Sequence, residues 1–202
     1  MKKIVLSQRI ERISGRNELR ECVDSEIYKL IWKLGATPIP VSSFIQDTER
    51  YLNEIQPDGI LLTGGNDIGS EKMRDQSEYA LLKYAEKSKL PVFGVCRGMQ
   101  IINSYFGGAM TRVSNHVGND HLVKGTLYPN GRMVNSFHDF GITQEMLGEQ
   151  LNILAQTEDG VIEAIAHCNL PWHAVMWHPE RTQATIELDL TLIKSCLTEM
   201  SE

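Results

Sequence analysis

The sequence lacks a hydrophobic run of membrane-spanning length, and its first segment, MKKIVLSQRIER, returns to polar residues too soon for a signal peptide. It also lacks an excess of positive charge, since 20 Lys and Arg stand against 26 Asp and Glu, which gives a formal net charge of −6. The first absence argues against a membrane protein. The second disfavours nucleic acid and anionic membrane surfaces as partners. The expected location is therefore the cytoplasm.

Cysteine is present but sparse, and its spacing argues against two kinds of site. The four residues are Cys22, Cys96, Cys168 and Cys196. Because they form neither a CxxC pair nor a dense framework, we expect no structural disulfide and no zinc site. Three of them are interpreted as core residues, and Cys96 stands apart because of the glycines around it.

Internal repeats, low-complexity tracts and linkers are absent as well, so residues 1–202 are expected to form one domain. Short buried strands and amphipathic helices alternate along the first half. The expected strands lie at residues 3–6, 36–42, 58–65 and 91–95, and the expected helices at residues 18–34, 47–55 and 76–89. This order predicts an α/β fold with a mainly parallel sheet, helices on both faces, and binding sites at the carboxyl ends of the strands.

After Gly108 the pattern changes to shorter β-like pieces. A YPNGR turn and the segments NILAQT and VIEAIAH predict an additional antiparallel β segment built from hairpins. An apolar run at 172–177 and a helix at 182–199 are expected to complete the domain.

The segment PVFGVCRGMQ places Cys96 between Gly94 and Gly98, where an apolar run gives way to a helical pattern. A strand that ends at Val95 and a helix that begins at Arg97 force Cys96 into a sharp turn that presents its sulfur, as in a nucleophile elbow. The N–H groups of a helix amino terminus favour a thiolate there. By itself the motif leaves open the alternative that Cys96 is a small core residue beside two packing glycines.

The segment VMWHPE favours the catalytic interpretation. Pro179 biases His178 towards an extended conformation, in which side chains two residues apart point to the same side. Glu180 can therefore hold one nitrogen of the His178 ring while the other nitrogen faces a thiol. A lone histidine at a strand end is more often structural, but the glutamate and the cysteine turn together indicate a nucleophile with its base.

A second strand end supplies glycines, in the segment LLTGGND. Backbone N–H groups can approach a ligand closely at glycines, so Gly65 and the N–H of Arg97 are candidate oxyanion donors, and Gly64 is a candidate substrate contact. An ordinary turn is the alternative for the two glycines. Gln100, one helical turn after Cys96, can read a polar substrate beside the sulfur.

Taken together, GVCRGMQ, TGG and HPE resemble the class I glutamine amidotransferase fold over nearly the whole chain. TGGND, GVCRGMQIINSYFGG and VNSFH are more similar to stand-alone γ-glutamyl hydrolases of the peptidase C26 type than to ammonia-producing subunits. The resemblance implies a flavodoxin-like three-layer α/β/α sandwich, with Cys96 as nucleophile, His178 as acid/base and Glu180 as its orienting group. The glutamyl contacts that it implies are Gln100, the backbone around Asn135, Ser136 and Phe137, and His138.

The chain departs from that family at His138-Asp139-Phe140, where many members have two histidines or a histidine and a glutamine. The side of the site that holds the leaving group is therefore open. His116 and His121 are interpreted as solvated loop residues, with a place on that side as the alternative. Arg9, Arg12 and Arg16 follow the first strand and are candidate contacts for an anionic nucleotide, although exposed arginines are usually only solvated.

The expected reaction is hydrolysis of a γ-glutamyl amide through a glutamyl thioester, with release of glutamate and with no metal or organic cofactor. The leading substrate is a small molecule, a γ-glutamyl nucleotide amide such as the γ-glutamyl-CDP-amidate of capsule phosphoramidate synthesis. Three alternatives stay open: a γ-glutamyl-amine hydrolase, a glutaminase subunit that delivers ammonia to a synthetase partner, and a non-catalytic glutamate-binding or thiol-sensing module. A homodimer is also compatible with the sequence.

Overall fold

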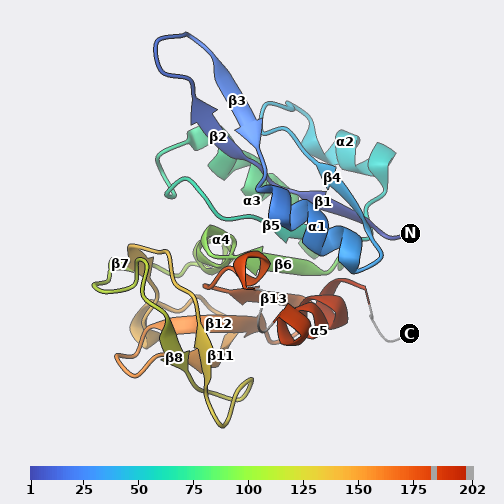
Figure 1. Cartoon of the computed structure of the whole chain (residues 1–202). Helices are drawn as coiled ribbons and strands as arrows, with labels where there is room; N and C mark the ends of the chain where they lie inside the picture. Colours follow the sequence, from blue (N-terminus) through green and yellow to red (C-terminus); the bar gives the residue numbers. More distant parts are fainter. Residues whose placement is uncertain (183–185, 199–202) are drawn as a thin grey trace.

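The computed structural model describes residues 1–182 and 186–198. Seven strands form its main sheet: β1 (Lys3–Leu6), β4 (Thr37–Pro40), β5 (Gly59–Leu62), β6 (Val92–Val95), β11 (Leu151–Gln156), β12 (Ile162–His167) and β13 (Trp172–Val175). They lie in the order β11-β12-β13-β6-β5-β1-β4 (Figure 1). The run from β13 to β4 is parallel, and its order is that of flavodoxin-like sheets. The fold prediction is confirmed.

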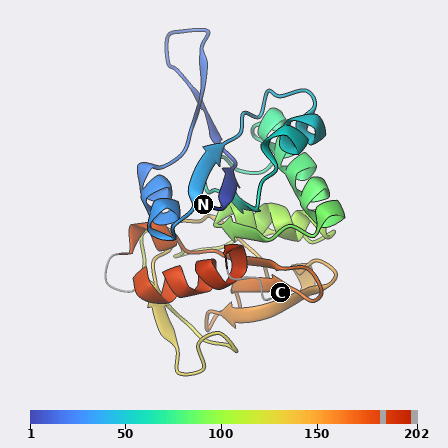
Figure 2. The same cartoon turned by 90° about the vertical axis from the view of Figure 1, so that its right-hand side faces the viewer.

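Helices cover both faces of this sheet, as Figure 2 shows. They are α1 (Ser25–Lys33), α2 (Thr48–Ile55), α3 (Lys72–Ser88), α4 (Arg97–Tyr105) and α5 (Ile186–Leu197). One core lies under α1 and α5 and takes Ile4 and Leu6 from β1, and the other lies under α2, α3 and α4 and takes Val5. Alternate residues of a strand face opposite sides, so a continuous apolar strand such as β1 fills both cores.

The predicted antiparallel segment is present. Strand β12 extends the sheet antiparallel to β13, and β11 pairs antiparallel to β12. Four shorter strands lie between α4 and β11: β7 (Thr111–Arg112), β8 (His121–Val123), β9 (Arg132–Val134) and β10 (Phe140–Gly141). β8 pairs with β9 and β7 with β10. Two bridges, Lys124 to Gln156 and Ile142 to Ile162, tie this segment to the main sheet.

The expected helix over 18–34 is wrong in its first half. Residues 9–22 form a hairpin of β2 (Arg9–Arg12) and β3 (Leu19–Cys22), which projects from the sheet in Figure 1. The helix begins only after Asp24, because the Asp24 carboxylate caps it by accepting from the Glu26 N–H. Leu19 therefore lies on an exposed strand, 44% accessible, although its spacing fitted the helical pattern.

Other helices differ from the expected ones by a few residues at their boundaries. α3 begins at Lys72 instead of residue 76. Thr182 is not helical, and α5 is described over Ile186–Leu197, while residues 183–185 and 199 of the expected last helix lie outside the described residues. A short 3-10 helix (Gln144–Met146) precedes β11, and another (Pro179–Arg181) follows His178. Over residues 1–182 and 186–198, none of the helices has the length and apolar character that a bilayer crossing requires.

Candidate active site

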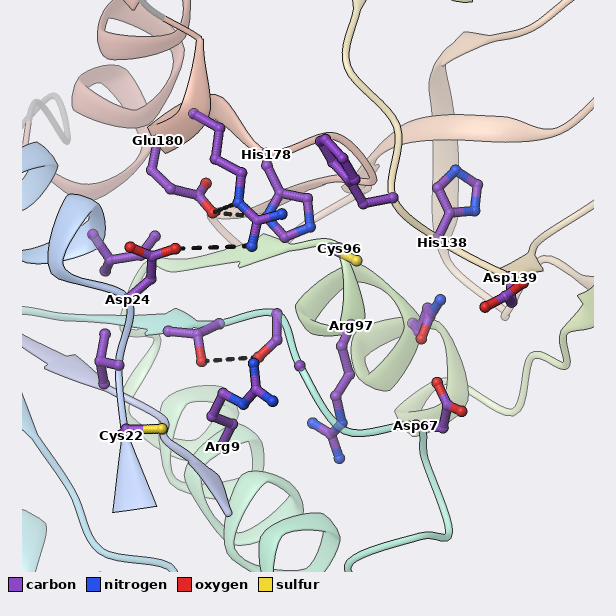
Figure 3. Close-up of a pocket in the computed structure, with 18 of the residues that line it drawn as sticks. Arg9, Cys22, Asp24, Asp67, Cys96, Arg97, His138, Asp139, His178 and Glu180 are labelled. Atoms are coloured by element: carbon purple, nitrogen blue, oxygen red, sulfur yellow. Dashed lines mark hydrogen bonds and ion pairs between the residues drawn. The ribbon is translucent and has the colours of Figure 1, made fainter. Parts of the chain in front are cut away.

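A pocket of about 360 Å³ opens where β5, β6 and β13 end (Figure 3). This is the edge of a parallel sheet at which ligands are expected to bind. The predicted site residues that line it are Arg9, Gly64, Gly65, Cys96, Arg97, Gln100, Phe137, His138, His178 and Glu180. Residues far apart in the sequence thus meet at one rim.

Cys96 occupies the turn between β6 and α4 with backbone angles φ 52° and ψ −107°. This positive φ is strained for a residue with a side chain, and the surroundings hold it in place. The Cys96 N–H donates to the Val175 carbonyl at 2.8 Å. A Cβ on Gly94 would lie 2.6 Å from the Gly98 carbonyl carbon, and one on Gly98 would overlap the Leu62 carbonyl. The two glycines therefore allow α4 to approach the sheet closely.

His178 follows β13 and faces this sulfur. Its Nδ1 lies 2.7 Å from Glu180 Oε1, and both side chains are buried. Burial alone lowers the pKa of His178, but hydrogen bonds with Cys96 and with Glu180 raise it, and the balance is a pKa of about 9. The imidazole thus lies between the Cys96 sulfur and the Glu180 carboxylate, and its interactions with both favour its protonated form.

Asn135 fixes the backbone of His178. Its Oδ1 accepts from the His178 N–H at 2.8 Å, and its Nδ2 donates to the His178 carbonyl at 2.8 Å and to Thr182 Oγ1 at 2.6 Å. The Asn135 side chain lies outside the pocket lining, so a glutamyl contact at this position would come from its backbone, as the resemblance implies. Both polar groups of the amide are already used within the protein.

The side chain of Ser136 also lies outside the pocket lining. It is 1% exposed, and its hydroxyl donates to the His116 carbonyl at 2.5 Å. Phe137 and His138, the next two residues, do reach the pocket. Within the predicted substrate segment, the pocket lining thus begins at Phe137.

The glycines after β5 lie against the catalytic candidates. A Cβ on Gly64 would lie 2.9 Å from His178 Cε1 and 3.6 Å from Cys96 Cβ. Gly65 has φ +110°, a conformation that glycine adopts without strain. The Arg74 guanidinium supports the turn, since its Nη2 donates to the carbonyls of Thr63 at 2.8 Å and Gly64 at 2.9 Å.

A buried ionic network joins α3 to α4 beneath this turn, and the sequence reasoning missed it. The Arg97 side chain pairs with Glu78 and, at 2.6 Å, with Asp75, while Arg74 pairs with the same Glu78 at 3.0 Å. Arg74, Glu78 and Arg97 are each at most 1% exposed. The available signal was the i,i+4 spacing of Arg74 and Glu78, but surface pairs share that spacing. The network fixes the residue that follows Cys96.

The structure places the three arginines that were predicted to contact the leaving group in different surroundings. Arg9, at the base of the hairpin, lines the pocket, whereas Arg12 forms a two-bonded ion pair with Glu71 at 2.8 and 2.9 Å outside it. Arg16 lies 3.8 Å from Glu18 near the exposed tip. Arg12 and Arg16 therefore lie outside the pocket lining, because the hairpin carries them away from the sheet edge.

Charged side chains divide the pocket into two sides in Figure 3. Asp67 and Asp139 lie on the side of Cys96 where His138 lies, and Arg9 and Asp24 lie on the other. Arg181 joins this second side, at 3.8 Å from Asp24 and with its guanidinium 5.1 Å from the centre of the Phe137 ring. Gln100, which donates to the Phe140 carbonyl at 3.0 Å, is buried beneath the pocket.

His116 and His121 are not solvated loop residues. His116 is 3% exposed, and the side chain of His121 is 15% exposed. Both pack with His138 around Glu163, whose side chain is fully buried. Glu163 was not singled out in the sequence, since it lies in a strand pattern in which a single acidic residue carries no motif.

Comparison with known proteins places this geometry in a family. The peptidase C26 family model matches residues 5–180. The γ-glutamyl-CDP-amidate hydrolase of Campylobacter jejuni is 33% identical over 188 residues, which cover 88% of this chain and 90% of that protein. Anthranilate synthase component 2 of Azospirillum brasilense is 30% identical over 170 residues, which cover 80% and 85% of the two chains.

The fold itself recurs in solved structures. A glutamine amidotransferase from Thermotoga maritima superposes with a TM-score of 0.67 at 14% identity, over 96% of this chain and 83% of that one. Such low identity supports the fold and not the reaction. With the family match over most of its length, the chain belongs to the peptidase C26 family and is a hydrolase that acts on the C–N bonds of amides.

Proposed function

We propose that the chain hydrolyses a γ-glutamyl amide by way of a glutamyl thioester on Cys96. His178 holds the proton of the Cys96 thiol, and the sulfur attacks the γ-carbonyl carbon. As the C–N bond breaks, His178 gives that proton to the departing nitrogen. Water then attacks the thioester carbon and passes a proton to His178, and glutamate leaves as the C–S bond breaks. Glu180 holds the imidazole in the orientation that both steps need.

Backbone donors beside the sulfur complete the proposed mechanism. Arg97 is the first residue of α4, where N–H groups have no partner within the helix. Its N–H and that of Gly65 are proposed to hold the oxyanion that forms on the γ-carbonyl. Gly65 lines the same pocket as Cys96, which supports this assignment.

One observation carries the proposal. Cys96 lies at a positive φ on a helix amino terminus, and the imidazole that faces it is held at 2.7 Å by a buried carboxylate. A structural cysteine needs neither this backbone conformation nor a histidine whose pKa is raised to about 9. The arrangement is that of a cysteine nucleophile with its base and orienting group.

Replacing the nucleophile tests the scheme. We expect Cys96→Ala to abolish release of glutamate from γ-glutamyl amides, and Glu180→Gln to lower kcat by about 10²–10⁴-fold while leaving some turnover. An electrophilic glutamine analogue should add one glutamyl-derived mass to the protein at Cys96. Cys168→Ala, at an exposed free cysteine, is the matched control and should behave as the parent. A fully active Cys96→Ala protein would contradict the proposal.

The leading substrate is a γ-glutamyl nucleotide amide of the γ-glutamyl-CDP-amidate kind. Its ammonium group would lie towards Asp67 and Asp139, because carboxylates accept from ammonium groups. Its anionic leaving group would lie towards Arg9 and Arg181, which bind phosphate oxygens in a forked geometry. The similarity to the Campylobacter jejuni enzyme supports this choice, and a role in capsule synthesis in the cytoplasm would follow from it.

Comparing anionic and neutral leaving groups tests the substrate. Glutamine, a γ-glutamyl polyamine and a γ-glutamyl nucleotide amide should be compared by kcat/KM. Arg9→Met and Arg181→Met should each lower the value for the nucleotide amide by about tenfold, or about 1.4 kcal/mol, and change that for glutamine little. Arg12→Met, outside the pocket, should change neither. A strong preference for glutamine in the parent would exclude the nucleotide substrate.

The second candidate is an ammonia-producing subunit, because anthranilate synthase component 2 is also a relative. Such a subunit would need a synthetase partner for full turnover, whereas the proposed hydrolase needs none. Turnover by the purified chain separates the two. A rate near 1 s⁻¹ or above without any second protein would support the hydrolase. Sluggish turnover that a synthetase chain accelerates would support the subunit.

A further inference from the structure

Four side chains beside the pocket form a group that the proposed reaction does not use, here called the histidine–glutamate cluster. Its members are His116, His121, His138 and Glu163, and one ligand atom from each lies within 4.8 Å of all the others. Glu163 belongs to β12 of the main sheet, whereas the histidines come from the antiparallel segment. Half of the six histidines of the chain thus meet at one carboxylate.

The ring nitrogens converge on the Glu163 carboxylate. His138 Nε2 lies 3.2 Å from Glu163 Oε1, and His116 Nδ1 and His121 Nε2 each lie 3.6 Å from the same oxygen. Glu163, His116 and His138 are at most 3% exposed. A buried carboxylate is therefore surrounded by three imidazoles and withdrawn from water.

The opposite nitrogens of two rings are held by acceptors. His138 Nδ1 lies 3.0 Å from the Phe140 carbonyl oxygen, which can only accept, so this nitrogen carries a proton. His116 Nε2 lies 3.1 Å from Asp159 Oδ2, and the other oxygen of Asp159 accepts from Thr157. Histidines that bind metals are commonly oriented in this way, by a carbonyl or a carboxylate on the second ring nitrogen.

If the rings of His116 and His138 are neutral, these bonds place the ring proton on the nitrogen that faces away from Glu163. The lone pair of the other nitrogen then points at the Glu163 carboxylate, which cannot donate to it. Consistent with this, His116 Nδ1, His121 Nε2 and Glu163 Oε2 are buried atoms without a hydrogen-bond partner in the described part of the chain. Unpaired buried acceptors are costly. A cation between the three nitrogens and the carboxylate would satisfy all of them together.

We propose that the histidine–glutamate cluster binds one structural Zn²⁺. Three imidazoles and one carboxylate match the ligands of zinc, which prefers nitrogen and oxygen at about 2.0–2.2 Å in tetrahedral geometry. Ligand atoms of such a site lie ~3.3 Å apart, so the set would contract by up to about 1.5 Å on binding. With four protein ligands no position is open for substrate, which indicates a structural site.

The proposed ion would support one wall of the active-site pocket. His138 and its neighbours Phe137, Asp139 and Phe140 line the pocket, and Glu163 anchors them to the main sheet. Zinc would cross-link this wall to β12 without touching the reacting atoms. The cysteine pattern predicted no metal because it concerns only thiolate ligands, whereas the four ligands of this cluster come from separate segments without a local motif.

Metal content tests the proposal, and the Cys96→Ala protein is the material to use because it removes the active-site thiol as a competing ligand. We expect this protein, prepared without a histidine tag, to contain or take up one Zn²⁺ per chain. Co²⁺ in place of zinc should give the strong visible absorption of a four-coordinate centre. Removal of zinc by a chelator should lower Tm, and stoichiometric zinc should restore it.

Variants locate the ion. His121→Ala and Glu163→Gln should lose the Zn²⁺ and the Co²⁺ spectrum, whereas His173→Gln, at a partly buried histidine outside the cluster, should retain both. No stoichiometric binding of Zn²⁺ or Co²⁺ by the folded Cys96→Ala protein would overturn the proposal, as would binding that both cluster variants preserve. These readouts do not depend on turnover, so the zinc proposal and the proposed function can fail independently.

Discussion

At the scale of single residues, Gly64 shows how tightly the site is packed around its imidazole. A methyl group there would lie 2.9 Å from His178 Cε1, closer than real side chains approach. We expect Gly64→Ala to displace the ring and lower kcat by about 10²-fold, since misplacement of a catalytic group by about 1 Å costs that much. Steady-state kinetics with Tm measured on the same samples would check this.

Gly59→Ala is the matched control for this substitution. Its Cβ would also meet close neighbours, with the nearest atom at 3.2 Å, but these lie in the core and away from the pocket. It should lower Tm without a large change in kcat. A Gly64→Ala protein with the kcat of the parent would show that the glycine is not needed to place His178.

The raised pKa of His178 gives the stability a pH dependence with a definite sign. Burial opposes the charged ring, but its bonds with Cys96 and Glu180 raise the pKa from 6.5 to about 9. Since the folded state binds the proton more tightly, this stabilisation is complete below about pH 6.5 and is lost as pH rises through 9. Urea unfolding should therefore show that His178→Gln lowers the free energy of unfolding by less at pH 9.5 than at pH 6, each relative to the parent at the same pH. An equal difference at both pH values would contradict this.

At the scale of elements, the packing of α3 against α4 depends on a shared carboxylate. Glu78 pairs with both Arg74 and Arg97, and all three side chains are buried. Glu78→Gln would leave two buried guanidinium groups without this partner, so we expect a loss of about 3–5 kcal/mol in the free energy of unfolding. Denaturant unfolding measures it. Glu71→Gln, which breaks the exposed pair with Arg12, should cost far less.

Elements also differ in how well their sequences predict them. β1 and β5 are short apolar runs that fill both cores, and their identity was evident from composition alone. The β2–β3 hairpin was not predicted, because Leu19, in β3, fits a helical spacing that continues to Leu34. Its conformation is decided by contacts with another part of the chain: the Asn66 side chain accepts from the Ile10 N–H and donates to the Ile10 carbonyl, each at 2.9 Å.

At the scale of the whole molecule, stability should be distributed unevenly between the sheet and the hairpin. β6 is buried along its whole length and pairs with β5 and β13, whereas in β2 only Ile10 is buried. Hydrogen exchange followed by mass spectrometry should therefore show peptides of residues 9–22 exchanging well before those of residues 92–95. Equal protection of the two regions would mean that the hairpin is held by contacts absent from this structure.

The sequence by itself determined the α/β class, the strand that leads into the turn at Cys96, and the pairing of His178 with Glu180. These follow from local patterns: apolar runs, glycines at a sharp turn, and two-residue spacing in an extended chain. Only the tertiary structure decided that Asn135 supports His178, that Arg12 and Arg16 lie outside the pocket, and that three histidines surround Glu163. Those relations join residues between about 20 and 60 positions apart. Spacing along the chain does not predict these contacts, because they form only when separate strands and loops pack together.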